Sequence, residues 1–297
     1  MKVLSTRFMP EPCVLAIGKF ESIHRGHNAL IRDVVAMAKT LDIASAVMVF
    51  TPHPYNILHK DHHKTAYQPL FSREERGFLL QSLGINYLLE YPFDAALMAL
   101  SPQTFADILH NDLKAVKVVV GEAFHFGYNR TGTVNDLPAV HIVKNIDNIS
   151  TSSIRALLNE KIPRLDEARK LLGFPYFITG VATQGRQLGR TLGFPTLNLY
   201  PKAEKFLPRF GVYATQTRLN GCVYNGVTNI GLRPTVSTTK TVPSVETHLF
   251  DFKDDAYGCD MHVAFLHFIR DEQKFNSLED LKQQINVDVI HAKRILI

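Results

Sequence analysis

Cysteine is scarce in this sequence of 297 residues. The three cysteines, Cys13, Cys222 and Cys259, stand far apart, which excludes a disulfide framework and a cysteine-based zinc site. This use of cysteine fits a reducing compartment, so we expect a cytoplasmic protein. Long hydrophobic runs are missing as well: no segment approaches the roughly 20 apolar residues that cross a bilayer, and no signal-like region opens the chain. We therefore expect neither a membrane protein nor an exported one.

A strong excess of one charge is also missing. The chain has 33 basic and 28 acidic residues, a formal net charge of +5. Residues 1–172 carry 19 basic and 17 acidic side chains, and the remainder carries 14 and 11. Neither half has the concentrated positive field that duplex DNA requires. We expect small anionic ligands and no nucleic acid.

The first half of the sequence alternates short apolar runs with amphipathic helical patterns. Strands are expected at 14–17, 44–50, 87–89, 116–120 and 141–143. Helices are expected at about 28–41, after the capping box of Ser72 and Glu75, and after Ser101. This β-α-β alternation predicts an α/β domain with a parallel sheet and helices on both faces. Its ligands should lie beyond the carboxyl ends of the strands.

The second half is rich in short β-type runs separated by glycine, proline and asparagine. Six such runs predict a six-stranded antiparallel β-barrel, followed by a terminal helix that opens at Ser277. A helix over about 165–172 ends in Gly173 and Pro175, so the domain boundary is expected there. The predicted domains are 1–172 and 173–297. The six runs read FITGVAT, TLNLY, GVYATQTRL, CVYNGVTNIG, VETHLF and MHVAFLHFI.

Two histidines lie in the loop between the first strand and the first long helix. The loop reads GKFESIHRGH, so His24 and His27 stand at the N-terminus of that helix. Imidazoles and free backbone N–H groups around one point suit the phosphates of a nucleotide, because such donors meet the charge that grows during transfer. Two histidines in an ordinary surface turn are the alternative, which the flanking strand and helix disfavour.

A second candidate phosphate-binding segment reads ISTSSIR, at 149–155. Ser150 can cap a helix, and Arg155 follows about one turn later. Hydroxyls and a guanidinium in this order can hold a triphosphate from its other side. A common N-cap explains the same residues, so the pairing with the histidine loop is what favours a site.

Aromatic residues follow two further strands at the same edge of the predicted sheet. The segments read FTPHP at 50–54 and VGEAFHFG at 120–127. Such rings can hold a flat heterocycle, and they serve equally well as hydrophobic anchors of the loops. Three more histidines, His59, His62 and His63, lie in a polar loop. Because they lack suitable partners, we expect a solvated turn there and no metal.

The most informative stretch of the second half covers residues 180–198 and reads GVATQGRQLGRTLGFPTLN. Its glycines let the backbone approach phosphates, and Thr196 and Asn198 project the same way, so both can reach a metal–phosphate group. It is no Walker loop, and a glycine-rich barrel turn is the alternative. Glu246 is the lone carboxylate within VETHLF. It faces either solvent or a site in which it is a base.

These segments occur together, and in this order, in one family. From about residue 12 to residue 293 the chain resembles the prokaryotic bifunctional riboflavin kinase/FMN adenylyltransferases, also called FAD synthetases. The first half resembles their Rossmann-like nucleotidyltransferase module through GKFESIHRGH, FTPHP, VGEAFHFG and ISTSSIR. The second resembles their kinase module through GRTLGFPTLN, GVYA, NIGLRPTV, VETHLFDF and FIRDEQKF. A joint match across two modules is far more specific than either histidine motif alone.

The resemblance implies an activity and the residues that perform it. Riboflavin is phosphorylated by ATP to FMN, FMN is adenylylated to FAD, and ADP and pyrophosphate are released, with Mg²⁺ as cofactor and a monomer or weak homo-oligomer as the working form. Glu246 is implied as the base, and Thr196 and Asn198 as the ligands of Mg–ATP. At the transferase site, His24, His27 and Arg155 are the implied catalytic residues. Further implied contacts are Gly18, Phe20, Gly26, Ser150 and Gly189 for ATP, and Phe50, His53, Pro54, Phe124, Phe126 and Arg270 for the flavin.

The chain departs from the family's first motif, which usually reads G-N-F-D-G-V-H-x-G-H. Lys19, Glu21 and Ser22 replace its Asn, Asp and Gly, and Ala123 replaces a polar residue in the later aromatic loop. Ser22 strains the turn if its φ is positive, and Glu21 carries its carboxylate one methylene farther out. We therefore expect FAD synthesis to be slower than FMN synthesis. Two alternatives stay open: a riboflavin kinase with impaired or lost transferase activity, and a flavin-sensing regulatory protein.

Overall fold

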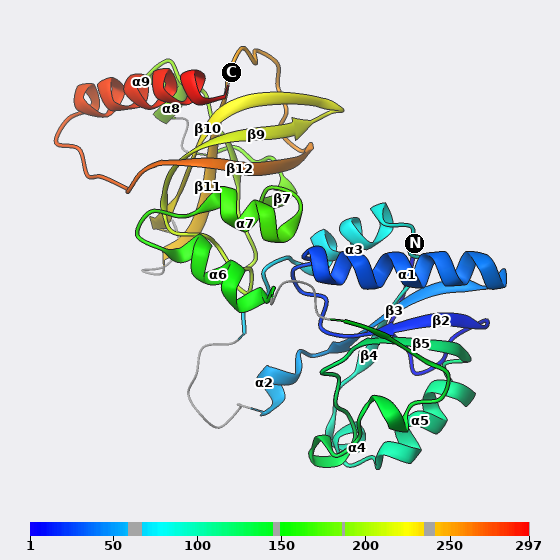
Figure 1. Ribbon diagram of the computed structural model, residues 1–297. Helices are drawn as coiled ribbons and strands as arrows, with labels where there is room; N and C mark the ends of the chain where they lie inside the picture. Colours follow the sequence, from blue (N-terminus) through cyan, green and yellow to red (C-terminus); the bar gives the residue numbers. More distant parts are fainter. Residues whose placement is uncertain (59–66, 145–148, 186–187, 235–240, 297) are drawn as a thin grey trace. The chain divides into compact units, whose positions relative to one another are not determined.

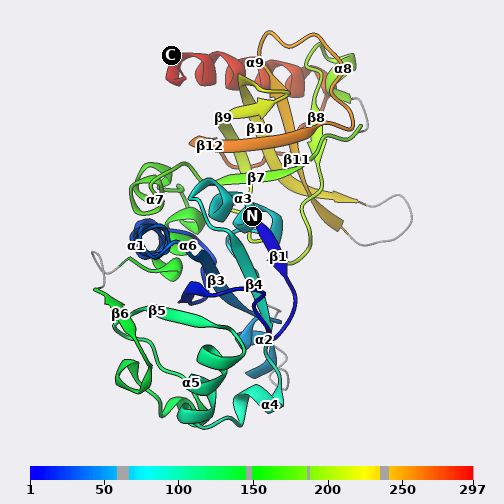
Figure 2. The ribbon, with the colours of Figure 1, turned by 90° about the vertical axis from the view of Figure 1, so that its right-hand side faces the viewer.

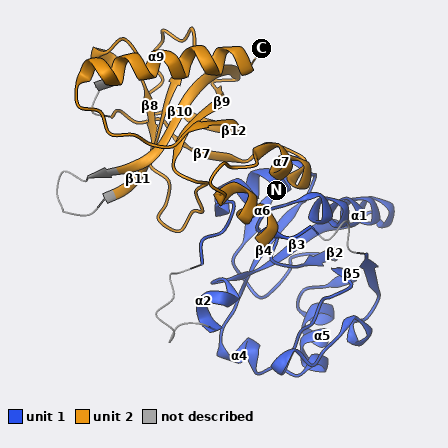
Figure 3. Cartoon of the chain, turned by 60° about the vertical axis from the view of Figure 1, so that its left-hand side comes forward, with its two compact units in different colours: residues 1–151 blue, residues 152–297 orange. Residues whose placement is uncertain are grey.

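The computed structural model describes residues 1–58, 67–144, 149–185, 188–234 and 241–296 (Figure 1). The chain forms two compact units, residues 1–151 and 152–297 (Figure 3). No helix within the described ranges is long and apolar enough to span a membrane. The loop histidines His59, His62 and His63 lie outside the described residues.

Unit 1 contains a six-stranded sheet in the order β1-β4-β3-β2-β5-β6. All neighbouring strands pair in parallel, which confirms the predicted sheet. The edge strand β1 was not expected, because three residues carry too little pattern to indicate a strand. The strands are β1 (Lys2–Leu4), β2 (Cys13–Ile17), β3 (Ala44–Thr51), β4 (Tyr87–Pro92), β5 (Ala115–Gly121) and β6 (Val140–Val143).

Helices cover both faces of this sheet. Helix α1 (Arg25–Leu41) lies over one face and α5 (Pro102–Asn111) over the other (Figure 1). Helix α1 buries Leu30, Ile31, Val34 and Ala38, spaced three and four residues apart, as an amphipathic helix on a sheet requires. The smaller helices are α2 (Pro54–Leu58), α3 (Arg73–Ser82) and α4 (Ala95–Met98), with 3₁₀ turns at Tyr128–Arg130 and Val134–Asp136.

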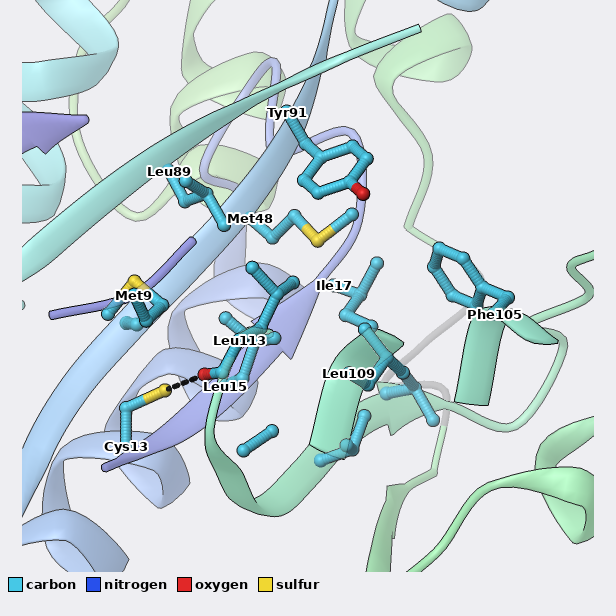
Figure 4. Packing of buried hydrophobic residues seen from close by; sticks show 14 of the residues in the cluster. Met9, Cys13, Leu15, Ile17, Met48, Leu89, Tyr91, Phe105, Leu109 and Leu113 are labelled. Carbon is cyan, nitrogen blue, oxygen red and sulfur yellow. Dashed lines mark hydrogen bonds between the residues drawn. The ribbon is translucent and has the colours of Figure 1, made fainter. Parts of the chain in front are cut away.

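The hydrophobic core on the α5 side of the sheet joins alternate strand residues to α5 and to the loop after it (Figure 4). Leu15 and Ile17 of β2 and Met48 of β3 meet Leu109 of α5 in this cluster. Cys13 lies in the same cluster, where burial raises the pKa of its thiol to about 12. A buried thiol of this kind is an unreactive core residue.

Unit 2 contains the predicted six-stranded antiparallel barrel, in the order β7-β12-β9-β10-β11-β8. The two ends of the sheet meet just beyond β7, where Thr183 and Asn198 exchange backbone hydrogen bonds of 2.8 and 3.1 Å. This bridge closes the barrel between its first and second strands along the chain. The strands are β7 (Phe177–Val181), β8 (Leu197–Leu199), β9 (Gly211–Leu219), β10 (Cys222–Pro234), β11 (Thr241–Leu249) and β12 (Asp260–Arg270).

Among the residues that the structure describes, the helices that accompany the barrel are α6 (Thr151–Asn159), α7 (Leu165–Leu172), α8 (Leu188–Thr191) and α9 (Leu278–Ile295). The expected terminal helix, α9, runs alongside the barrel (Figures 1 and 2) and packs Ala292 against β9 and β10. Helix α7 packs on β12 and ends at Gly173, whose φ is 91°. Both α7 and nearly all of α6 belong to the second compact unit, whereas the boundary predicted from the sequence falls after residue 172.

Candidate active sites

The loop after β2 makes a tight turn over the carboxyl edge of the parallel sheet. Its positive φ angles fall on Phe20, at 44°, and on Ile23, at 43°, and both side chains are fully buried. Packing therefore holds a left-handed backbone that these residues disfavour in isolation. Ser22 is not among the residues with positive φ. The condition under which it would strain the turn is not met.

His24 is the N-cap of helix α1, which begins at Arg25, three residues before the start expected from the sequence. Its Nδ1 accepts a hydrogen bond of 3.2 Å from the backbone N–H of His27, so the neutral ring carries its proton on Nε2. The two imidazoles stack with centroids 3.8 Å apart and planes 11° apart. A Cβ on Gly26 would lie 3.2 Å from the His24 ring, so glycine leaves room for this cap.

Burial keeps both histidines of this pair neutral near pH 7. Desolvation lowers the pKa of His24 to about 4. Desolvation, with the neighbouring His24 ring adding repulsion, lowers the pKa of His27 well below its ordinary value. The side chain of His27 also has a buried Nδ1 without a hydrogen-bond partner among the described residues. The pair is therefore two neutral imidazole rings, and not cations, at the first turn of α1.

The ISTSSIR segment approaches this loop within unit 1. The hydroxyls of Ser22 and Thr151 lie 2.9 Å apart and share a hydrogen bond. Ser150, directly before Thr151, is exposed at the start of α6. Arg155 belongs to unit 2, where its guanidinium lies 5.0 Å from the ring centre of Phe206. The start of the segment therefore contacts the histidine loop. Its arginine packs on a ring within unit 2.

The aromatic loops leave β3 and β5 at the same edge of the sheet. Phe50 is half-buried at the end of β3 and meets Phe93 edge to face, with centroids 5.6 Å apart. Phe124 is half-buried as well, and it stacks on Phe126, 5.6 Å away. Phe126 itself is 7% exposed and packs in the core against Phe105. Phe124 therefore offers the more accessible ring of this loop.

His53 is held by two neighbours, and one of them comes from the histidine loop. Its Nε2 lies 2.8 Å from Oε1 of Glu21, and its Nδ1 accepts the backbone N–H of Tyr55 at 3.2 Å. The hydroxyl of Tyr67 also donates to the Glu21 carboxylate. Tyr67 was not among the expected site residues. It lies 46 positions from Glu21, and no spacing rule connects them.

In unit 2, Asn198 of β8 stands directly opposite Glu246 of β11, and Asn229 of β10 stands opposite Glu246 on its other side. Directly opposed residues of antiparallel strands share a face, so these three side chains form one row across the barrel. Glu246 is half-buried, while Val245 and Thr247 on either side are completely buried on the other face. Thr196, two residues before Asn198, precedes the same strand and is half-buried.

Two glycines bring the 180–198 segment close to this row. A Cβ on Gly185 would lie 2.5 Å from the amide nitrogen of Asn198, so the segment fits over this side chain only because the residue is glycine. A Cβ on Gly189 would lie 2.3 Å from the carbonyl oxygen of Phe194, whose N–H donates to the Gly189 oxygen at 2.7 Å. The sequence does not single out Gly185, because its contact with Asn198 forms only when the barrel closes.

Arg270, an expected flavin contact, is engaged elsewhere in the fold. Its Nε and Nη2 donate to the buried carboxylate of Asp288 on α9 at 2.7 to 3.1 Å, and Nη1 donates to the carbonyl of Asp271. A bidentate pair of this kind fixes both partners. The visible role of Arg270 is to tie α9 to the end of β12.

The possible metal donors of unit 2 are oxygen atoms. Thr196, Asn198 and Glu246 offer a hydroxyl, an amide carbonyl and a carboxylate, which suit Mg²⁺ rather than a transition metal. Across the described part of the chain, no three or more His, Cys, Asp and Glu side chains gather as a metal site. Such a set fits an ion that is held mainly by substrate phosphates and water.

Comparisons with known proteins match both halves of the chain. A family model described as FAD synthetase matches residues 7–162, and one described as riboflavin kinase matches residues 172–296. Bifunctional riboflavin kinase/FMN adenylyltransferases of Bacillus subtilis (strain 168) and Escherichia coli (strain K12) are each 35% identical, over 95% of this chain and 92% of their own. A crystal structure of a macrolide-efflux protein from Streptococcus pneumoniae superposes with a TM-score of 0.81 at 28% identity, covering 96% of this chain and 97% of that one.

Proposed function

The chain belongs to the family of bifunctional riboflavin kinase/FMN adenylyltransferases, and from this premise we propose how its residues divide the two reactions. The protein is a transferase that phosphorylates riboflavin to FMN and adenylylates FMN to FAD, with ATP as the co-substrate of both steps. The assignment of sites is supported by one observation: each unit brings together a set of the expected residues, the His24–His27 stack in unit 1 and the Asn198–Glu246 pair in unit 2. With both halves matched, neither the kinase-only alternative nor the flavin-sensing alternative is favoured.

At the transferase site we assign the ATP phosphates to the N-terminus of α1. A phosphate oxygen of FMN forms a bond to the α-phosphorus, the bond from that phosphorus to its bridging oxygen breaks, and pyrophosphate leaves. Nε2–H of His24 and the N–H groups of the first helical turn donate to the phosphoryl oxygens as their charge grows. Gly18 and Gly26 leave room for the rings of Phe20 and His24 beside this point. No side-chain nucleophile is needed.

Ser150 and Arg155 remain assigned to the same phosphates from the other side. The Ser22–Thr151 hydrogen bond supports the assignment of Ser150, because it ties the start of the segment to the histidine loop. For Arg155 the assignment rests on the sequence motif, and within unit 2 its guanidinium lies over the ring of Phe206.

At the kinase site we assign Glu246 as the general base. Its carboxylate takes the proton of the terminal ribityl hydroxyl of riboflavin, the hydroxyl oxygen bonds to the γ-phosphorus of ATP, and the bond to ADP breaks. Asn198 lies opposite Glu246, so base and phosphate donors share one face of the barrel. Gly189 holds the turn that leads to Thr196 and this face.

We propose Mg²⁺ as the cofactor, with Thr196 and Asn198 as the residues that hold it together with ATP. The ion neutralises charge on the phosphates when it is bound. The oxygen-only donor set supports this choice of metal.

For the flavin of the transferase site we propose contacts with Phe50, His53, Pro54 and Phe124, which stand after neighbouring strands at one edge of the sheet. Phe126, as a core residue, would support Phe124 rather than touch the ligand. Arg270 would act on the riboflavin of the kinase site by holding α9 in place through Asp288. Domains 1–172 and 173–297, and a monomer or weak homo-oligomer in the cytoplasm, remain part of the proposal.

The experiment that tests the proposal follows both reactions in one tube. The protein is incubated with riboflavin and Mg–ATP, and riboflavin, FMN and FAD are separated over time. We expect FMN first and FAD later, with both products lost when EDTA removes the metal. Production of FMN alone would limit the chain to the kinase. Flavin binding without ATP turnover would favour the sensor.

A further inference from the structure

A buried carboxylate joins three separate segments beside the transferase site. Glu21, in the loop after β2, is 3% exposed. It accepts hydrogen bonds from Nε2 of His53, which follows β3, and from the hydroxyl of Tyr67. The backbone N–H of Tyr67 in turn donates to the side chain of Asn56 on α2 at 2.8 Å. His53 likewise has a second contact, because its Nδ1 accepts the backbone N–H of Tyr55.

These contacts set the orientation of two aromatic rings. His53 and Tyr67 stack with centroids 4.2 Å apart and planes 9° apart. Because Nδ1 of His53 accepts the Tyr55 N–H while Nε2 faces the carboxylate, only the Nε2-protonated neutral tautomer satisfies both contacts. The His53 ring cannot turn without breaking its hydrogen bonds to Glu21 and Tyr55. The hydroxyl of Tyr67 is anchored on the same carboxylate, and stacking on His53 sets the plane of its ring.

The buried charge of Glu21 requires this arrangement. A carboxylate removed from water is stable only when donors and opposite charge surround it. Here the side chains of His53 and Tyr67 donate to it, and the guanidinium of Arg76 on α3 interacts with Glu21 as well as with Glu90. Glu21 stands where the family's first motif usually has aspartate, and its carboxylate meets both His53 and Tyr67. A buried carboxylate that is engaged in this way fixes the positions of its partners more than it adds to the free energy of unfolding.

We propose that Glu21 is a positioning residue of the adenylyl-transfer reaction, which holds the stacked rings of His53 and Tyr67 as a platform for the isoalloxazine ring of FMN. The inference rests on the proposed function. The platform follows β3, the direct neighbour of β2, while the ATP phosphates are assigned to α1 directly after β2. FMN, the second substrate, is therefore the one that we assign to the rings of His53 and Tyr67. A flat tricyclic ring adds to a stack of two parallel rings through dispersion and apolar burial.

The test is steady-state kinetics of FMN-to-FAD conversion in the full chain, with FMN and ATP varied separately. Tyr67→Phe keeps the ring and removes its hydrogen bond to Glu21. We expect KM for FMN to rise about tenfold to a hundredfold, the scale of one hydrogen bond to a charged group, with KM for ATP and the riboflavin kinase rate unchanged. Glu21→Ala should raise KM for FMN further, and Glu21→Gln should recover part of the loss.

A matched control removes a similar contact elsewhere in the same unit. The hydroxyl of Tyr87 on β4 donates to the carboxylate of Glu11, so Tyr87→Phe also deletes a tyrosine–glutamate hydrogen bond. This variant should keep the wild-type KM for FMN. The double variant Glu21→Ala/Tyr67→Phe should cost no more than Glu21→Ala alone, because both changes remove the same bond.

The outcomes separate this inference from the proposed function. If the wild-type chain makes no FAD from FMN, the proposed transferase activity fails. If FAD is made, an unchanged KM for FMN in Tyr67→Phe overturns the platform, as does an effect on KM for ATP in its place. Equal effects of Tyr67→Phe and Tyr87→Phe would also overturn it, because they would reduce the contact to a general stabilising role.

Discussion

Replacement of Gly185 by alanine is the most direct test of how the kinase site is assembled. The new Cβ would stand 2.5 Å from Nδ2 of Asn198 and 2.8 Å from its Cγ and Oδ1. Ordinary contact between such atoms begins near 3.5 Å, so one partner must move by about 1 Å. The backbone of Asn198 is bonded in both directions to Thr183, at 2.8 and 3.1 Å. The side chain of Asn198, or the segment around Gly185, therefore absorbs the displacement.

A shift of this size removes a phosphate or metal donor from its working position. Misplacement on the scale of ~1 Å can cost about 10²-fold in rate, so kcat/KM for riboflavin phosphorylation should fall by 10- to 100-fold. FMN-to-FAD conversion, assigned to the other unit, should stay near wild type and serves as the internal measure of intact protein. Gly180→Ala is the matched control, because its Cβ would meet Leu199 at an ordinary 3.4 Å. If Gly185→Ala keeps the wild-type kinase rate, the fit of glycine over Asn198 has no catalytic role and the reasoning is wrong.

Three further predictions concern the two units. Glu246→Gln should reduce riboflavin phosphorylation by ~10²–10⁴-fold, the usual cost of a lost general base, and leave FMN-to-FAD conversion unchanged; an unaltered kinase rate would remove Glu246 from the mechanism. The fragments 174–297 and 152–297 should both phosphorylate riboflavin. Fragment 152–297 should have a melting temperature at least about 5 °C higher, because α7 buries three side chains in unit 2. Equal melting temperatures would show that α6 and α7 add no stability. His24 has a lowered pKa of about 4, so the unfolded chain binds its proton first as pH falls, and stability is lost between about pH 6.5 and 4. Urea unfolding should show the wild type losing on the order of 3 kcal/mol more than His24→Asn across this window, and parallel losses would contradict the buried neutral histidine.

The sequence predicted those features that depend on local pattern. The strands of both units follow from their apolar runs, and the capping box of Ser72 and Glu75 forms as expected. The start of α1 was missed because His24 is its cap, whereas the residues that usually signal a helix start are Ser, Thr, Asp and Asn. His24 therefore belongs to the phosphate-binding motif and also caps helix α1. A histidine directly before an amphipathic helical pattern is accordingly a possible N-cap.

The contacts that complete each site could not be predicted, because they join residues far apart in the chain. Gly185 meets Asn198 only after the barrel closes through Thr183. Tyr67 reaches Glu21 from a segment that carries no motif of its own. Such contacts depend on the way strands bring loops together, and a residue type alone does not signal them.

The departures from the family's first motif acquire different meanings once the fold is known. Ser22 carries no strained φ, and its hydroxyl bonds to Thr151. Lys19 and Ala123 are exposed, so they can tune binding without disturbing the packing. Glu21 is the departure with structural consequences, because its longer arm holds two donors within a buried site. Slower FAD synthesis remains a prediction from the motif, and the platform gives no reason for it, because Glu21 holds the rings of His53 and Tyr67 in place. Since Glu21 acts through the platform, any effect of this departure should appear in KM for FMN rather than in the rate of adenylyl transfer at saturation.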